Sequence, residues 1–250
     1  MCDKSPKINI SRQKSGVEHR MKSLLKNELQ GWSRSELLWL ITACGIITGL
    51  SLYWGDSLMG IISSVTGVAC VVCTGKGKLS AYFFGLINCV LYAIISYEAK
   101  LYGETMLNAV YYIPMQFVGF FIWKKNINQE TKEVTKKKMK LPGLLLTIAA
   151  MLAGTIFYGL ILKGLGDAMP FVDAFTTVSS VVAMIVSIRM YAEQWLIWVA
   201  VNLFSVYMWW CDFMNGSNNL ATLLMWAVYL VNAVVMLIKW EKEAAKSSAV

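Results

Sequence analysis

The sequence predicts an all-α, polytopic membrane protein with eight transmembrane helices. Hydrophobic residues make up 57% of the 250 residues, and the mean hydropathy is +0.54. Apolar runs of about 18–22 residues recur along the chain, and each is long enough to cross a hydrocarbon layer of ~30 Å. Lysine and arginine gather in the segments between alternate runs, which is typical of the cytoplasmic face of a membrane protein.

The first 35 residues are polar and contain eight lysines or arginines. The part from Val17 to Trp32 could form an amphipathic helix on the membrane surface. A tail without fixed structure suits this composition equally well. The first apolar run begins only near Leu37, so we expect no cleavable signal peptide.

Eight apolar runs follow, and their connections are short apart from one basic linker. We place the spans near residues 37–54, 57–74, 79–97, 105–123, 141–162, 170–188, 194–212 and 219–239. The linker, residues 124–140, contains seven lysines, and Pro142 directly after it suits the first turn of a helix.

The distribution of positive charge predicts the orientation. With eight spans, the tail, the loop with Lys76 and Lys78, the 124–140 linker and Arg189 all fall on one side. The other side receives two lysines together with several carboxylates, namely Lys100, Lys163, Asp56, Glu98, Glu104 and Asp167. By the positive-inside rule we expect a multi-pass membrane protein with both termini in the cytoplasm.

A weak internal repeat divides the chain further. At an offset of 114 residues Asn88 aligns with Asn202, and at an offset of 117 Tyr112 aligns with Tyr229 and Trp123 with Trp240. Chance matching among apolar residues is the alternative explanation. Because the two units are four spans apart, they would have the same orientation, which is the parallel 3+1+3 plan of SWEET-type carriers.

This plan gives six segments in chain order. They are a basic cytoplasmic tail (1–35), an extra N-terminal transmembrane helix (36–56), a first three-helix bundle (57–123), a basic linker with its own transmembrane helix (124–169), a second three-helix bundle (170–240) and a cytoplasmic C-terminal tail (241–250).

The spans exclude several functions. None has a lysine or arginine in its interior, so a phosphate inside them would be an uncompensated buried anion. The net charge of +8 follows from the loops and does not indicate nucleic acid. The single histidine, His19, lies in the tail, and no carboxylates are paired within the spans. We therefore expect no catalytic residues, no metal site and no cofactor.

Uncharged polar residues remain as binding candidates. Asn88, Gln116 and Asn202 lie near the middle of their spans, where an amide is costly unless it is paired. Tyr112 and Gln116 share one helix face, and Tyr229 and Asn232 are close together on the last span. Helix–helix hydrogen bonding is the structural alternative for all of them. Trp32, Trp54, Trp123, Trp226 and Trp240 lie near span ends and are interpreted as interface residues.

One short motif carries a family resemblance. Trp195, Trp198 and Asn202 form W-x-x-W-x-x-x-N, which resembles the signature of PnuC nicotinamide riboside transporters. Asn88 and Gln116 match positions that contact substrate in that family, whereas Tyr112, Tyr229 and Asn232 rest on spacing alone. The resemblance implies a SWEET-like fold, a homotrimer, and uptake of nicotinamide riboside without a coupling ion. A cytoplasmic kinase would then trap the riboside.

The predicted function is therefore facilitated diffusion of nicotinamide riboside by alternating access. The substrate-binding set is Asn88, Tyr112, Gln116, Trp195, Trp198, Asn202, Tyr229 and Asn232. The same fold could instead carry another flat cationic vitamin, such as thiamine. A membrane sensor without transport is a further alternative, although the tail and linker are too short for an output domain.

Overall fold

The computed structural model describes residue 28 and residues 30–98, 102–128, 130–164, 170–217 and 219–247. Most of the expected amphipathic segment 17–32 therefore lies outside the described residues. The helices are α2 (Arg34–Trp54), α3 (Leu58–Lys76), α4 (Ser80–Glu98), α5 (Tyr102–Met106), η1 (Leu107–Tyr112), α6 (Ile113–Lys125), α7 (Leu141–Gly164), α8 (Pro170–Ile188), α9 (Gln194–Met214) and α10 (Leu220–Ser247).

Eight helical segments in the described part of the chain are long and apolar enough to cross a membrane. Helices α5, η1 and α6 are continuous and form one of them. The eight segments coincide with the eight predicted spans, so the predicted fold class is confirmed. The last helix differs, because it continues to Ser247, well beyond the predicted end at residue 239.

Local sequence explains where the first spans begin and end. Ser33 and Glu36 form a reciprocal capping box at the start of α2, which satisfies backbone N–H groups that have no helical partner. Gly55 and Gly77 end α2 and α3 with φ values of 78°, a left-handed conformation that a side chain would disfavour.

The fourth span contains a π-helical segment that the sequence pattern does not predict. Across η1 the backbone N–H of Ile113 donates to the carbonyl of Asn108, five residues earlier. Pro114 follows directly; it has no N–H, and its ring would crowd the carbonyl four residues before it. A wider turn relieves that conflict, and such π segments are frequent at functional sites.

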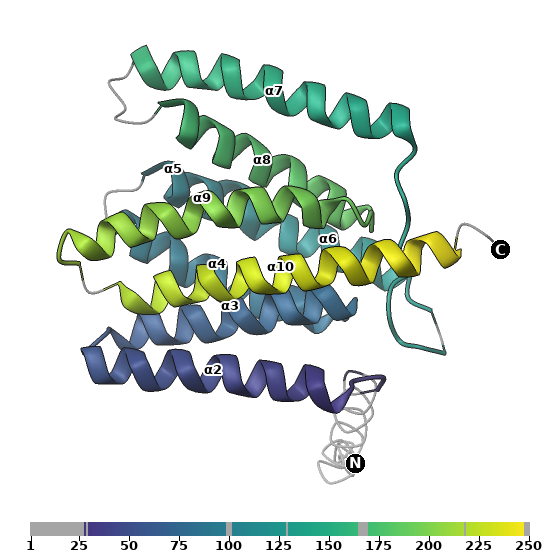
Figure 1. Cartoon of the computed structure of the whole chain (residues 1–250), viewed down its shortest axis with the longest axis horizontal. Helices are drawn as coiled ribbons and strands as arrows, with labels where there is room; N and C mark the ends of the chain where they lie inside the picture. Colours follow the sequence, from purple (N-terminus) through teal and green to yellow (C-terminus); the bar gives the residue numbers. More distant parts are fainter. Residues whose placement is uncertain are drawn as a thin grey trace, which may run out of the picture.

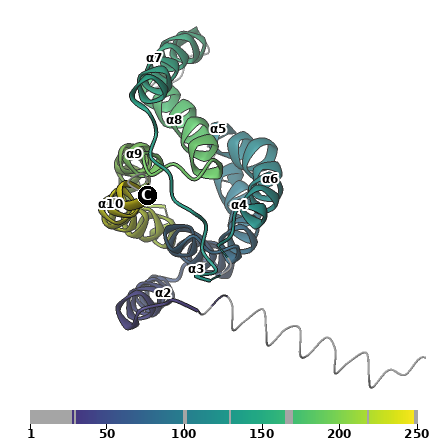
Figure 2. The ribbon, with the colours of Figure 1, turned by 90° about the vertical axis from the view of Figure 1, so that its right-hand side faces the viewer.

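The contacts between helices join six of the spans into a closed ring, which Figure 2 shows along the helix axes. Helix α3 packs on α4, α4 on α6, α6 on α8, α8 on α9, α9 on α10, and α10 returns to α3. The remaining two spans lie outside this ring: α2 packs on α3 and α10, and α7 packs on α8 (Figure 1). The ring therefore joins the two predicted three-helix units through the α6–α8 and α3–α10 contacts.

The 126–140 part of the basic linker crosses one end of this ring (Figure 2). Ile127 and Val134 form an isolated bridge, and Val134 is buried against the ends of the helices. Lys78 Nζ donates to the carbonyl of Lys132 at 3.2 Å, and burial lowers the pKa of this lysine. Because the linker is held by such specific contacts, it is a folded cover over one end of the ring.

Carboxylates neutralise much of the positive charge at this end. Glu36 pairs with Lys76 at 3.1 Å and with Lys239 at 2.6 Å. Glu133 of the linker pairs with Lys76 at 3.3 Å and with Lys136 at 3.0 Å. These partly buried pairs connect α2, α3, α10 and the linker.

A cluster of buried aromatic residues fills the same end of the ring, beneath the linker. Trp123 and Trp240 are fully buried, and Tyr82 and Trp195 pack with them. The Trp195 and Trp240 ring centroids are 5.9 Å apart, and those of Tyr82 and Trp123 are 5.1 Å apart. This aromatic cluster separates the interior of the ring from the linker.

Candidate functional site

A cavity lies inside the ring, and all six of its spans contribute to the wall. The lining comes from α3 (Cys70, Val71, Thr74), α4 (Ala81, Tyr82, Gly85, Asn88, Cys89, Tyr92), the fourth span (Glu104, Leu107, Asn108, Tyr112, Gln116), α8 (Ser180, Met184, Ser187), α9 (Trp195, Trp198, Asn202) and α10 (Met225, Trp226, Tyr229). The wall is thus rich in aromatic rings and uncharged hydrogen-bonding groups, and it contains neither lysine nor arginine among the described residues.

The structure brings seven of the eight predicted site residues to this cavity. They are Asn88, Tyr112, Gln116, Trp195, Trp198, Asn202 and Tyr229. The eighth, Asn232, does not line it. Its amide donates to the carbonyl of Val71 at 3.2 Å and so links α10 to α3.

Two polar atoms of the wall lack a hydrogen-bond partner within the described part of the chain. Trp195 and Asn202 are each 3% exposed, and both the Trp195 indole N–H and the Asn202 carbonyl oxygen are buried without one. A buried group of this kind costs about 1–3 kcal/mol if it stays unpaired. This donor and acceptor lie about two turns apart on α9, and they are suited to pair with a polar ligand in the cavity.

The other two amides are partly satisfied by the helices around them. Asn88 Nδ2 donates to the carbonyl of Ser63 at 2.9 Å and contacts its hydroxyl oxygen at 3.2 Å. Gln116 Nε2 lies 3.6 Å from the Cys89 sulfur, which is a weak acceptor. These contacts fix the amino groups of both amides against the wall.

Glycines permit this arrangement on α3 and α4. A Cβ atom at Gly67 would lie 2.1 Å from the Tyr229 hydroxyl oxygen and 2.8 Å from Asn88 Nδ2. A Cβ atom at Gly85 would lie 2.6 Å from Gln116 Oε1. All three distances are far below van der Waals contact. The arrangement of the site therefore requires glycine, which has no side chain, at both positions.

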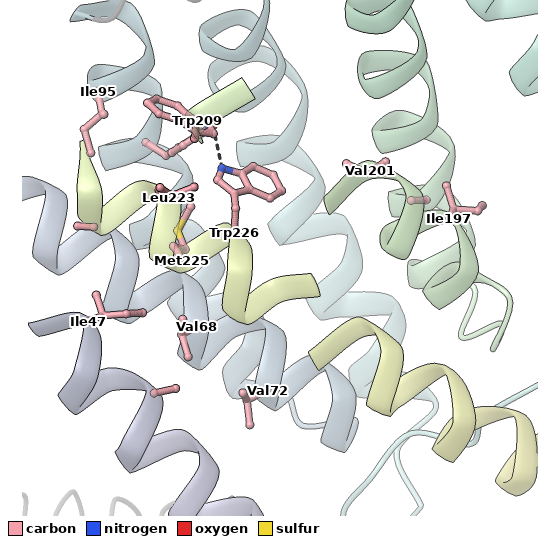
Figure 3. Packing of buried hydrophobic residues seen from close by; sticks show 14 of the residues in the cluster. Ile47, Val68, Val72, Ile95, Ile197, Val201, Trp209, Leu223, Met225 and Trp226 are labelled. Atoms are coloured by element: carbon pink, nitrogen blue, oxygen red, sulfur yellow. Dashed lines mark hydrogen bonds between the residues drawn. The ribbon is translucent and has the colours of Figure 1, made fainter. Parts of the chain in front are cut away.

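A pair of indoles stabilises the part of the cavity wall that Tyr92 forms. Tyr92 Oη accepts hydrogen bonds from Trp209 Nε1 at 3.1 Å and from Trp226 Nε1 at 3.3 Å. Figure 3 shows Trp226 with its nitrogen turned towards this partner, beside Trp209. The aliphatic residues around them, among them Leu223 and Ile95, complete the packing (Figure 3).

For three tryptophans the structure contradicts the prediction that they are interface residues. Trp123, Trp226 and Trp240 are not interface residues, because their exposed fractions are 0%, 9% and 0%. Trp123 donates to the carbonyl of Ser187 at 3.3 Å, and Trp240 donates to that of Gly75 at 2.7 Å. A position near the end of a span cannot distinguish a headgroup contact from a contact with a neighbouring helix.

Sequence reasoning missed several other lining residues. Cys70, Cys89, Ser187 and Met225 have no signal beyond their apolar surroundings. Glu104 was assigned to the external surface by its charge, and the structure places it in the cavity wall. The glycine spacing on α3 and α4 was the one sequence feature that could have indicated close packing around the amides.

Comparisons with known proteins point to one family of membrane transporters. A family model described as nicotinamide mononucleotide transporter matches residues 57–242. A nicotinamide riboside transporter PnuC from Neisseria mucosa is 42% identical, and the alignment covers 87% of this chain and 85% of that protein. The PnuC of Haemophilus influenzae is 33% identical over 87% of this chain and 95% of its own.

A solved structure, described as the vitamin B3 transporter PnuC, superposes with a TM-score of 0.81 at 41% identity. It covers 90% of this chain and 98% of that one. Since the family model spans most of the chain and the relatives align along most of their length, this chain belongs to the PnuC family of membrane transporters.

Proposed function

We propose that this protein carries nicotinamide riboside across the bacterial inner membrane by facilitated diffusion. The observation that carries the proposal is the unpaired donor–acceptor couple of Trp195 and Asn202 in an aromatic cavity. Nicotinamide riboside has a flat ring, a carboxamide and ribose hydroxyls, which such a wall complements. The names of the relatives from Neisseria mucosa and Haemophilus influenzae point to the same substrate.

The riboside fits better than the mononucleotide in the family description. The two compounds differ by a phosphate. No lysine or arginine is found among the described residues of the cavity wall, and a phosphate there would lose its hydration without gaining a counter-charge. The cavity therefore favours a ligand without phosphate.

We propose an individual role for each residue of the set that lines the cavity. Asn88, Gln116 and Asn202 bind the carboxamide and the ribose hydroxyls. Trp198 stacks on the ring, because an indole face attracts a flat cation. Trp195 donates its free N–H, and Tyr112 and Tyr229 complete the polar wall.

Alternating access about the cavity is the proposed mechanism. Two pairs related by the predicted repeat, Asn88 with Asn202 and Tyr112 with Tyr229, all line the cavity, which supports a duplicated three-helix unit. Helices α3 and α8, the first of each unit, run in the same direction in Figure 1. A parallel, SWEET-like repeat of this kind allows the units to rock against each other around a central site.

The linker end of the ring faces the cytoplasm in this proposal. The N-terminal end of α2 and the C-terminal end of α10 lie at that end (Figure 1), as expected when both termini are cytoplasmic. The chain acts as a homotrimer in which each copy has its own path. A cytoplasmic kinase phosphorylates the riboside after uptake, and the resulting phosphate prevents its return.

Uptake by purified protein in vesicles tests the proposal. Labelled riboside should equilibrate and not accumulate, with or without a proton or sodium gradient. Accumulation that follows an imposed gradient would overturn facilitated diffusion. Titration of the detergent-purified protein with riboside and with thiamine separates the two vitamins, because only the riboside should bind tightly. Light scattering of the same sample measures the number of copies.

A further inference from the structure

The two halves of the basic linker are attached to different three-helix units. The first half, the described residues of 126–134, continues from α6 and contacts the turn between α3 and α4. The backbone N–H of Val134 donates to the carbonyl of Gly77 at 3.2 Å. Glu133 pairs with Lys76 of α3 at 3.3 Å. These contacts fasten the first half to the first unit, which comprises α3, α4 and the fourth span.

The second half of the linker, residues 136–140, is attached to the second unit, which comprises α8, α9 and α10. The backbone N–H of Lys137 donates to the carbonyl of Met190 at 2.9 Å, in the turn between α8 and α9. The carbonyl of Lys137 accepts from the N–H of Ala192 at 2.9 Å. This half leads directly into α7, which packs on α8. Both its contacts and its continuation therefore fix it to the second unit.

One ion pair joins the two halves. Lys136 Nζ lies 3.0 Å from Glu133 Oε2, and the same ammonium pairs with Glu243 of α10. The Lys136 side chain is only 6% exposed, and its ammonium lies 5.7 Å from the Trp240 ring centroid. Removing one partner from such a buried pair leaves the other charge uncompensated. The Glu133–Lys136 pair is therefore a strong connection between the first half and the second.

The position of this pair differs from that of the other contacts between units at the same end. Trp123 donates to Ser187 and Trp240 donates to Gly75, at two junctions between neighbouring helices of the ring. The linker instead crosses the end of the ring (Figure 2). The backbone contacts of each half can persist when the units move apart, because each half is bound to its own unit. The Glu133–Lys136 pair cannot, because it spans the division.

We propose that the linker is a two-part latch over this end of the ring, and that the Glu133–Lys136 ion pair is its clasp. The formed pair holds the two units together at the linker end. Its separation lets the units part there, while the chain through Thr135 keeps the halves connected. The inference rests on the proposed function for the role of this opening in alternating access, whereas the opening itself can be measured without a substrate.

Lys138 supplies a matched control in the same half of the linker. It pairs with Glu241 of α10 at 2.7 Å, and the two side chains are 49% and 33% exposed. That pair joins the second half to the second unit and does not span the division. An exposed pair of this kind contributes little to stability. Lys138→Met therefore removes the same ammonium group as Lys136→Met without touching the clasp.

The experiment measures the distance between the first half and α10 in purified protein in lipid nanodiscs, without substrate. Nitroxide labels replace the exposed side chains of Glu130 and Lys242. They are attached through a ketone-bearing amino acid, so the native cysteines stay in place. Pulsed electron paramagnetic resonance gives the distance distribution for the wild-type background and for Lys136→Met, Glu133→Gln and Lys138→Met. Thermal unfolding shows whether each variant is folded.

In Lys136→Met the ratio of the long-distance to the short-distance population should rise roughly tenfold or more. Glu133→Gln, which keeps the shape of the side chain, should give a similar rise, and Lys138→Met should match the wild-type background. An unchanged distribution in folded Lys136→Met or Glu133→Gln, or an equal rise in Lys138→Met, would overturn the latch. Failure of riboside uptake in vesicles would instead overturn the proposed function and leave these distances as they are.

Discussion

The indole rings of Trp123 and Trp240 lie 6.5 Å apart, centroid to centroid, at the linker end of the ring. They are 117 residues apart and occupy equivalent places in the predicted repeat. Each donates its N–H across the junction between units: Trp123 to Ser187 of α8, and Trp240 to Gly75 of α3. The two junctions of the ring are thus fastened in the same way.

Loss of either of these hydrogen bonds should destabilise the closed end. Trp240→Phe keeps most of the buried ring but leaves the Gly75 carbonyl without its donor. We expect a loss of about 1–3 kcal/mol in the free energy of unfolding, and Trp123→Phe should give a similar value. Denaturant unfolding in detergent measures both. The control is Trp54→Phe, since Trp54 is 52% exposed; an equally large effect there would contradict this account of the junctions.

The unequal surroundings of Asn202 and Asn232 predict opposite phenotypes. Asn202→Leu removes an unpaired acceptor from the cavity, so riboside affinity should fall by roughly tenfold or more while folding is retained. Asn232→Leu removes the contact with Val71, so stability should fall while affinity changes little in the folded fraction. Calorimetry and thermal unfolding on both variants measure the two effects. Undiminished binding by Asn202→Leu would mean that its amide serves only the helices.

Gly67 provides a test of the site in which no binding residue is itself replaced. In Gly67→Ala the new methyl group would displace the Tyr229 hydroxyl and the Asn88 amide, and it would also crowd the Met225 sulfur. We expect an affinity loss of roughly tenfold, because both groups would leave their positions in the wall. Gly49→Ala is the control, since nothing lies within 4 Å of its Cβ position. Titration with riboside compares them, and equal affinities would exclude the proposed role of Gly67.

Tyr92 should contribute to stability through its hydroxyl oxygen. In Tyr92→Phe the indole N–H groups of Trp209 and Trp226 lose their shared acceptor. Each buried donor left unpaired costs about 1–3 kcal/mol, so the variant should unfold at a clearly lower denaturant concentration. Tyr53→Phe, at a side chain that is 81% exposed, should be neutral. Similar midpoints for the two variants would show that the indoles find other acceptors.

Hydropathy was sufficient to predict the eight spans, because each must present an apolar surface to lipid whatever its neighbours are. Hydrophobic periodicity was less informative inside the ring. Asn232 has the composition and depth of a binding residue, yet it faces Val71, and sequence alone does not distinguish the two sides of a buried helix. The π-helical turn before Pro114 depends on local backbone strain that apolar patterns do not record.

Glu104 illustrates the same limit for charges. A carboxylate near the end of a span suggests a solvent-exposed position. The packing of α5 against α4 instead places Glu104 in the cavity wall. No pattern in the sequence indicates this packing. Asn88 and Asn202, in contrast, were predictable. An amide at mid-membrane depth is unfavourable unless it is paired, and the repeat places one at the same depth in both units.

A structure of this protein with nicotinamide riboside bound tests the central claim most directly. We expect the pyridinium ring of the riboside to stack on Trp198, inside the cavity. One polar group of the riboside should lie within hydrogen-bonding distance of Asn202 Oδ1, and another should lie near Trp195 Nε1. A riboside bound outside this cavity, or one bound inside it with Asn202 turned towards a neighbouring helix, would contradict the account.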